Sequence, residues 1–194
     1  MQWPIPDVFL LPSGPMTDAQ FTADSRTALI LIDLQHWILE MHAWQPRPAS
    51  DVVDACARLR AAFAPVIHVR YLRADGADGG PDAPANQLHE RCAPGPDDLL
   101  VTKHGLDAFE GTGLAAHLAA SGVTGVVLAG LSTAHGVAAT ARTALASGLA
   151  VTVVSDATAT VTAAEQDAVL GELAGAGAAV RTVDEVLAGL VTGG

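Results

Sequence analysis

The sequence predicts an α/β fold of three layers, with helices on both faces of a parallel, Rossmann-like sheet of six strands. Three observations predict it. Apolar runs of strand length recur along the chain, helical segments lie between them, and half of the 194 residues are hydrophobic. Strands that alternate with helices indicate βαβ units, which place the strands in parallel and cover both faces of the sheet. Because only 16% of the residues are charged, the chain has ample material for a large core.

Each expected strand is a short apolar run. The first, Thr27 to Asp33, reads TALILID, and a continuous run of this kind suits a strand that is buried on both faces. The others are Pro65 to Tyr71, Leu99 to Thr102, Val123 to Gly130, Leu149 to Asp156 and Ala178 to Val183.

The expected helices occupy the segments between the strands. In Ser50 to Phe63, apolar residues recur at helical spacing and Ser50 is the expected N-cap. The others are Gly111 to Gly122, Val137 to Gly148, Thr162 to Gly177 and Asp184 to Leu190, and several end at a glycine, as helices commonly do. The stretch from Ala74 to Pro96 is rich in Gly, Pro and Asp. We expect it to be a loop with a short helix, lying over or beside an active site.

Composition limits the organisation and the partners of the chain. Residues 1–26 are expected to form an N-terminal extended arm, because prolines at positions 4, 6, 12 and 15 exclude an early helix, and residues 27–194 form one domain. The net charge of −11 argues against nucleic acid or an anionic membrane as a partner. With no signal peptide or membrane span recognised, we expect a cytoplasmic protein. Two cysteines cannot form a disulfide framework or a cysteine-rich zinc site.

Polar residues stand at the ends of three expected strands. Asp33 ends the first strand, with Gln35 and His36 just after it, and Lys103 ends the third. The fourth runs into the turn GLSTAHG, residues 130–136. Ligands of open parallel sheets bind at the carboxyl ends of strands, so these three ends are expected to converge on a site. Taken singly, Asp33 also fits a helix N-cap, and Lys103 also fits a surface lysine.

Several motifs, in order and in register, carry a resemblance to a known family. They are LILIDLQ, APGPDDLLVTK followed by DAFEGTGL, GLSTAHGVAATARTA, and VVSDATA. Together they resemble the isochorismatase-like hydrolase family. The resemblance implies a parallel six-stranded α/β sheet and, in most members, a catalytic Asp, a Lys and a nucleophilic Cys. Asp33 and Lys103 match the first two, whereas the Cys position falls on Gly136.

The glycine at this position changes the chemistry that the resemblance implies. Neither Cys56 nor Cys92 is placed to substitute, and glycine cannot act as a nucleophile. The true isochorismatases and a related phenazine-pathway enzyme also have Gly there, and TAHG and IPDVFLLP resemble their sequences. That subgroup hydrolyses a vinyl ether: a carboxylic acid protonates the terminal methylene carbon, water adds, and pyruvate is released. The resemblance therefore implies that Asp33 is a general acid of raised pKa, and that Lys103 orients it and holds a substrate anion.

The candidate substrate contacts lie beside these residues. An anionic substrate needs local cations, for which Arg70, Arg73 and His68 are candidates, although His68 also fits a packed strand residue. The resemblance further implies a cis peptide bond between Leu131 and Ser132, and an anion-polarising N–H at Gly136. The remaining candidates to line the pocket are Gln35, Trp37, Trp44, Tyr71, Ser132 and His135. Two contacts of the subgroup, a Gln near Tyr71 and a Tyr at position 132, are absent.

Other interpretations of the same residues stay open. One is an amide or imine hydrolase in which Asp33 activates water and the Gly136 N–H stabilises the oxyanion. Another is a catalytically silent member that binds a small molecule or a partner, and a third is an altered protein in which Gly136 replaces a native Cys. No metal and no cofactor are expected, because the Asp-x-His sequence with which the nicotinamidases of the family bind a metal after the second strand is absent, as is a dinucleotide motif. The expected partners are a small-molecule anionic substrate and further copies of the chain, in a homodimer or a higher homo-oligomer.

Overall fold

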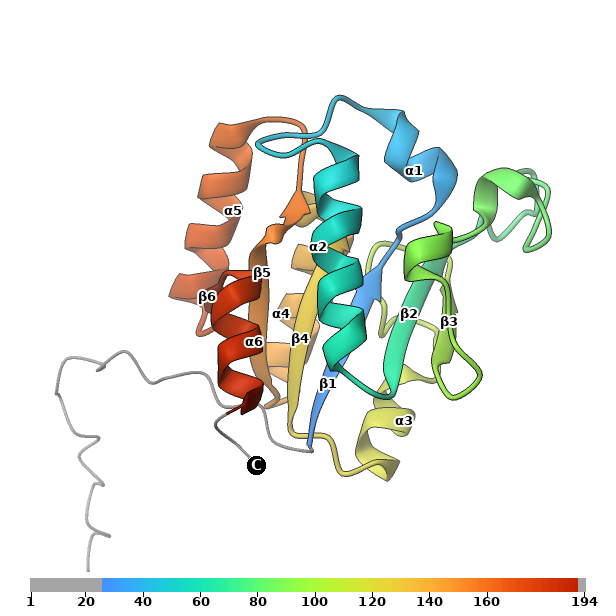
Figure 1. Ribbon diagram of the computed structural model, residues 1–194. Helices are drawn as coiled ribbons and strands as arrows, with labels where there is room; N and C mark the ends of the chain where they lie inside the picture. The colour runs from blue at the N-terminus through green and yellow to red at the C-terminus, as the bar shows by residue number, and fades with distance from the viewer. Residues whose placement is uncertain (1–25, 192–194) are drawn as a thin grey trace, which may run out of the picture.

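The computed structural model describes residues 26–191, and Figure 1 shows one sheet between layers of helices. All six strands are parallel, in the order β3-β2-β1-β4-β5-β6. The predicted fold class and the six-stranded parallel sheet are confirmed. The expected N-terminal arm lies outside the described residues, apart from Arg26.

The strands follow the apolar runs of the sequence, and β1 lies inside the sheet between β2 and β4. Successive side chains of a strand point to opposite faces, so Leu29 and Leu31 pack into one core cluster, and Ile30 and Ile32 pack into the other. This is why the run TALILI has no polar alternation. The strands are β1 (Thr27–Ile32), β2 (Val66–Tyr71), β3 (Leu99–Lys103), β4 (Gly125–Leu131), β5 (Ala150–Ala159) and β6 (Ala179–Arg181).

The helices divide between the two faces. One core cluster includes residues of α2 (Ala49–Ala62) and α6 (Val183–Val191). The other includes residues of α3 (Leu114–Ala120), α4 (Ala138–Ala146) and α5 (Ala163–Gly175). The short helix α1 (His36–Met41) follows β1 at the carboxyl edge of the sheet (Figure 1). None of the helices within residues 26–191 has the length and apolar character that crossing a membrane requires.

Three local expectations are corrected. Ser50 is not the N-cap of α2, because the helix begins one residue earlier, directly after the extended Pro48, and the Ser50 hydroxyl donates to Asp51 instead. Helix α1 was not expected from the sequence. Strand β5 continues to Ala159, three residues beyond its expected end, and a register shift interrupts its pairing with β4.

The long segment after β2 packs beside α1, and none of its residues lines the pocket described below. It contains two 3-10 turns, η1 (Pro84–Asn86) and η2 (Glu90–Cys92), in place of the single short helix that we expected. Its backbone is tied to the start of α1: the His36 N–H donates to the Gln87 carbonyl at 3.1 Å, and the His89 N–H donates to the Leu34 carbonyl at 2.8 Å. The segment therefore supports α1.

Gly130 lets β4 turn toward the site. It has φ of +113°, and a Cβ atom there would lie 2.1 Å from the carbonyl oxygen of Ile32 on the neighbouring strand. Only glycine fits such a close backbone approach. The peptide bond one residue further on, between Leu131 and Ser132, is cis, as the family resemblance implies. The chain then forms a single π-helical turn, η3 (Thr133–Val137), which leads into α4.

Candidate active site

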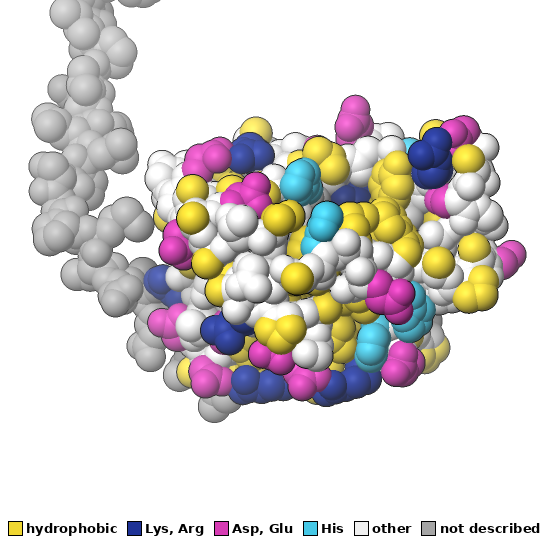
Figure 2. Space-filling model, turned by 90° about the horizontal axis from the view of Figure 1, so that it is seen from above, with side chains coloured by type: hydrophobic (Ala, Val, Ile, Leu, Met, Phe, Trp, Pro, Cys, Tyr) yellow, Lys and Arg dark blue, Asp and Glu magenta, His cyan; other side chains and the backbone are white. Residues whose placement is uncertain are grey.

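A pocket of about 510 Å³ opens at the carboxyl edge of the sheet, where the ligand site of a parallel sheet is expected. Its lining includes Asp33, Lys103 and Gly136, so the three predicted strand ends do converge. Figure 2 looks down on this end of the molecule and shows hydrophobic and histidine side chains gathered near the middle of the face.

Asp33 and Lys103 form a buried ion pair in the floor of this pocket. Asp33 Oδ2 lies 2.8 Å from Lys103 Nζ, and the side chains are only 9% and 1% exposed. Lys103 Nζ also donates to the Leu106 carbonyl at 2.6 Å. The pair therefore holds the Lys103 ammonium in a fixed position, and no second protein cation neutralises Asp33 among the described residues.

Asp33 is held in an unusual backbone conformation. Its φ is +54°, the left-handed region that Asp tolerates better than most residues, and it is the one non-glycine with positive φ among residues 26–191. Its N–H donates to the Val69 carbonyl at 2.9 Å, which anchors the turn to β2.

Burial raises the pKa of Asp33 from 3.8 to about 6, even though the Lys103 charge and hydrogen bond act in the opposite direction. The side-chain oxygen Oδ1 is buried and has no hydrogen-bond partner among the described residues, which further disfavours the charged form. A carboxyl group with this pKa can gain or lose a proton near neutral pH, as a general acid or base must.

Gly136 occupies the point at which a side chain would reach this pair. A Cβ atom there would lie 3.0 Å from Lys103 Nζ and 3.1 Å from Asp33 Oδ2. A nucleophilic side chain at position 136 would therefore project between the carboxylate and the ammonium. With glycine, that position carries no reactive atom.

The turn that holds Gly136 also brings two further predicted residues to the pocket, Ser132 and His135. Ser132 Oγ and His135 Nδ1 are hydrogen-bonded at 2.8 Å. Both residues therefore lie in the wall next to the ion pair, with their polar groups already engaged with each other.

Three aromatic residues proposed for the pocket also line it: Trp37, Trp44 and Tyr71. The ring centroids of Trp37 and Tyr71 are 6.2 Å apart. Trp44 is nearly buried, and its Nε1 donates to the carbonyls of Ile38 and Leu39 at 3.1 Å each. Trp44 is thus both a packing residue and a wall of the pocket.

The structure does not bring Gln35 or Arg70 to the pocket. Gln35 is fully buried, and its amide bonds to both backbone groups of Tyr71 and to the carbonyl of Asn86. Arg70 donates to Thr102 Oγ1 at 3.0 Å. Since side chains alternate along a strand and Tyr71 lines the pocket, Arg70 points to the other face of the sheet.

The other candidate cations are also elsewhere. Arg73 is exposed and pairs with Asp75 at 2.6 Å. His68 is packed in β2, where its Nε2 lies 3.2 Å from Asp98, and burial lowers its pKa. Among the described residues, no group of three or more His, Cys, Asp or Glu side chains is arranged to hold a metal ion.

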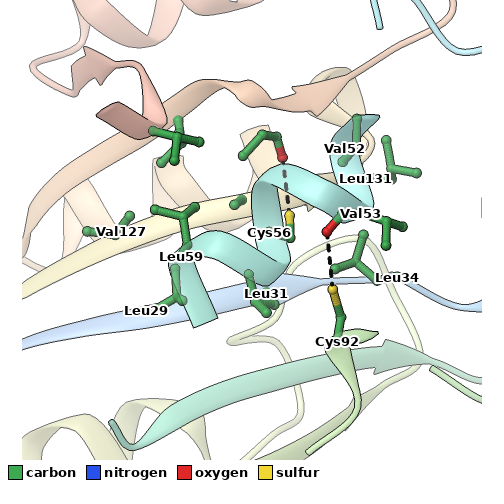
Figure 3. Close-up of a cluster of buried hydrophobic side chains, with 14 of the residues drawn as sticks. Leu29, Leu31, Leu34, Val52, Val53, Cys56, Leu59, Cys92, Val127 and Leu131 are labelled. Carbon is green, nitrogen blue, oxygen red and sulfur yellow. Dashed lines mark hydrogen bonds between the residues drawn. The ribbon is translucent and has the colours of Figure 1, made fainter. Parts of the chain in front are cut away.

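Neither cysteine supplies a thiol to the pocket. Cys56 on α2 and Cys92 in η2 lie in the core cluster between α2 and the sheet, as Figure 3 shows. Their Sγ atoms donate to the carbonyls of Ala157 and Val53 at 3.6 and 3.7 Å. Burial raises the pKa of the Cys56 thiol well above its usual value and that of Cys92 to about 11.

Sequence reasoning missed part of the pocket wall. Met41 ends α1, His104 and Leu106 follow β3, and Val161 follows β5. Their place in the sequence could have indicated three of these four residues, because these three come just after a strand whose carboxyl end faces the site. The segment from His36 to Met41 gave no such signal, because its helix was not recognised.

Comparison with known proteins points to one family. The family model described as the Isochorismatase domain matches residues 27–185. A streptothricin hydrolase from Streptomyces noursei is 35% identical over 164 residues, which are 77% of this chain and 64% of that protein. A second streptothricin hydrolase from the same organism is matched over 49% of its length. The chain thus spans less than two thirds of these two relatives.

Solved structures agree with this result. An isochorismatase family protein from Burkholderia thailandensis has a TM-score of 0.75 and 34% identity, over 88% of this chain and 98% of that one. A cysteine hydrolase from Pseudomonas syringae pv. phaseolicola 1448A has a TM-score of 0.74 and 27% identity, over 87% of this chain and 94% of that one.

Proposed function

The chain belongs to the isochorismatase family of hydrolases, and on that basis we propose that it hydrolyses a small carboxamide with water, rather than a thiol, as the nucleophile. The observation that carries this proposal is the buried pair of Asp33 and Lys103 facing a position, Gly136, that has no side chain.

The case for water starts from the missing nucleophile. Gly136 leaves unfilled the place where a side-chain nucleophile would meet Asp33, and both cysteines are buried in another part of the molecule. A water molecule bound above Gly136 would lie beside Asp33 Oδ2. The substrate carbonyl carbon is then attacked by this water, while the Gly136 N–H stabilises the oxyanion that forms.

The state of Asp33 favours a general base. With a pKa of about 6, roughly nine tenths of the Asp33 carboxyl groups are ionised at pH 7. The carboxylate takes a proton from the attacking water and returns it to the departing amine. Lys103, held at 2.8 Å, keeps the carboxylate oriented during this exchange.

The charges of the pocket favour a neutral substrate over the expected anion. Asp33 and Lys103 are the lining residues with a fixed charge among those described, and they neutralise each other. Arg70 and Arg73, the arginines expected to bind substrate carboxylates, are not in the lining. The name streptothricin hydrolase, carried by two relatives, agrees with hydrolysis but does not supply the substrate of this chain.

A second candidate is hydrolysis of a vinyl ether such as isochorismate or 2-amino-2-deoxyisochorismate, with Asp33 as general acid. One observation favours it: the raised pKa of Asp33 leaves about a tenth of the carboxyl groups protonated at pH 7. Protonation of the enolpyruvyl carbon followed by addition of water needs no side chain at position 136.

The dependence of the rate on pH separates these two functions. A panel of primary and secondary amides and isochorismate is assayed between pH 4.5 and 9, by amine release and by pyruvate release. If Asp33 is a general base, kcat/KM for an amide rises with pH through about 6 and then levels off. If Asp33 is a general acid, kcat/KM for the ether falls as pH rises through the same value.

Two variants and one measurement complete the test. Asp33→Asn should abolish either reaction, whereas Asp82→Asn, which removes an exposed carboxylate, should leave it unchanged. Mass spectrometry of the enzyme during turnover should detect no acyl adduct. An adduct on Ser132 would refute water as the nucleophile, and hydrolysis by Asp33→Asn at the wild-type rate would refute the role of Asp33. No turnover of either substrate class would favour a silent binding protein.

A further inference from the structure

The mouth of the pocket carries three exposed apolar side chains, beside the exposed imidazoles of His42 and His104. Met41, Leu106 and Val161 are 45%, 56% and 43% exposed, and all three line the pocket. Among residues 26–191, four large hydrophobic side chains are exposed, and these are three of them. The fourth, Leu100, lies outside the pocket lining. Exposed apolar side chains concentrated at one pocket are a mark of ligand recognition.

The three residues converge from separate parts of the chain. Met41 ends α1, Leu106 follows β3 and Val161 follows β5. The aromatic rings of Trp37 and Tyr71 continue the apolar wall inward. The ion pair of Asp33 and Lys103 lies on the floor, and the hydrogen-bonded Ser132 and His135 lie in the wall.

We infer that the substrate is an uncharged amide with an aromatic or alkyl group on its acyl side, and that Met41, Leu106 and Val161 bind this group and set chain-length specificity. This inference rests on the proposed function for the position of the amide. An apolar group of several carbons would cover side chains that are otherwise open to water, whereas a carboxylate would enter a pocket whose ammonium is already paired.

The experiment measures binding without turnover. The full chain is titrated with primary amides from propionamide to hexanamide, and with the carboxylates of the same lengths, at pH 7. The readout is tryptophan fluorescence, since Trp37 and Trp44 line the pocket, and calorimetry is used in parallel. The dissociation constant of the amides should fall about fourfold per added methylene until the wall is reached. Each carboxylate should bind at least about tenfold more weakly than its amide.

Matched variants assign the effect to the mouth of the pocket. Val161→Thr keeps the side-chain shape and should flatten the dependence on chain length, and Met41→Gln should do the same. Leu100→Thr, an exposed hydrophobic residue away from the pocket, should leave the dependence unchanged. Sedimentation of each variant reports whether these side chains are instead covered by a second copy of the chain.

The outcomes distinguish this inference from the function that it extends. Amides that bind with the expected dependence but are never hydrolysed would overturn the proposed reaction and leave the specificity intact. Hydrolysis of amides without any dependence on chain length would overturn the specificity and leave the proposed reaction intact. The inference is overturned by tighter binding of carboxylates, by the absence of saturable binding, by equal effects of Leu100→Thr and Val161→Thr, or by variants that alter only the oligomeric state.

Discussion

Replacing Lys103 with Met should raise the pKa of Asp33 from about 6 to between about 7 and 9. The two side chains are 2.8 Å apart, and at an effective dielectric constant near 20 their attraction amounts to about 6 kcal/mol, or about four pKa units, as an upper bound. Opposite charges at such distances lower carboxyl pKa values by about 1 to 3 units in practice. Burial, the larger effect, remains in the variant.

The assay is a titration of the Asp33 carboxyl carbon by NMR, with Asp33→Asn identifying its resonance. It needs no substrate, so it holds whatever the reaction is. Met approximates the volume of Lys, and near-UV circular dichroism checks that the variant keeps its packing, because the Leu106 carbonyl loses a donor. An Asp33 pKa near 4 in the wild type would refute the dominance of burial. An unchanged value in Lys103→Met would refute the coupling.

Three further outcomes are expected. Gln35→Ala should lower the free energy of unfolding by at least about 3 kcal/mol, because three backbone groups lose their hydrogen-bond partner. The control Gln87→Ala removes one exposed hydrogen bond and should lower this free energy by less than about 1 kcal/mol. Urea unfolding measures both values. The folded pKa of Asp33 lies above its unfolded value of 3.8, so the folded state holds an extra proton between these pH values, and its contribution to stability should fall by about 2 kcal/mol as pH rises from 4 to 7. Comparison with the uncharged pair Asp33→Asn/Lys103→Met isolates this term, and an equal pH dependence in both proteins would contradict it. Gly136→Ala places a methyl group 3.0 to 3.1 Å from the charged atoms and from Ile32 Cγ2, so these neighbours must shift, and turnover should fall on the order of 100-fold with some loss in the thermal midpoint. Full activity would show that the space above Gly136 is not used.

The fold could be predicted because the burial of a strand determines which residue types it contains. Strands covered on both faces must be apolar throughout, and the run from Thr27 to Ile32 shows this plainly. The sequence of helix α1 shows no comparable pattern. It has six residues and no side-chain cap, and its first turn is positioned by Gln35 and the segment after β2, which are far apart in sequence. The start of α2 was misplaced because Pro48 competes with Ser50 as a boundary residue.

The floor of the site could be predicted and its walls only in part. Asp33, Lys103 and Gly136 stand at strand ends, and parallel strands bring their ends together wherever their helices lie. Whether a strand residue lines the pocket depends instead on the face of the sheet to which its side chain points. Tyr71 and Arg70 are neighbours in the same strand, yet only Tyr71 lines the pocket.

The glycine at position 136 gives the protein a chemical tolerance that a cysteine hydrolase lacks. Peroxide, alkylating agents and electrophilic metabolites inactivate a catalytic thiolate, because the property that makes it reactive toward substrate makes it reactive toward them. Here the pocket offers those reagents no sulfur, and Cys56 and Cys92 are enclosed with raised pKa values. The hydrolysis by water that we propose for this site should therefore persist through oxidative stress that inactivates a cysteine hydrolase.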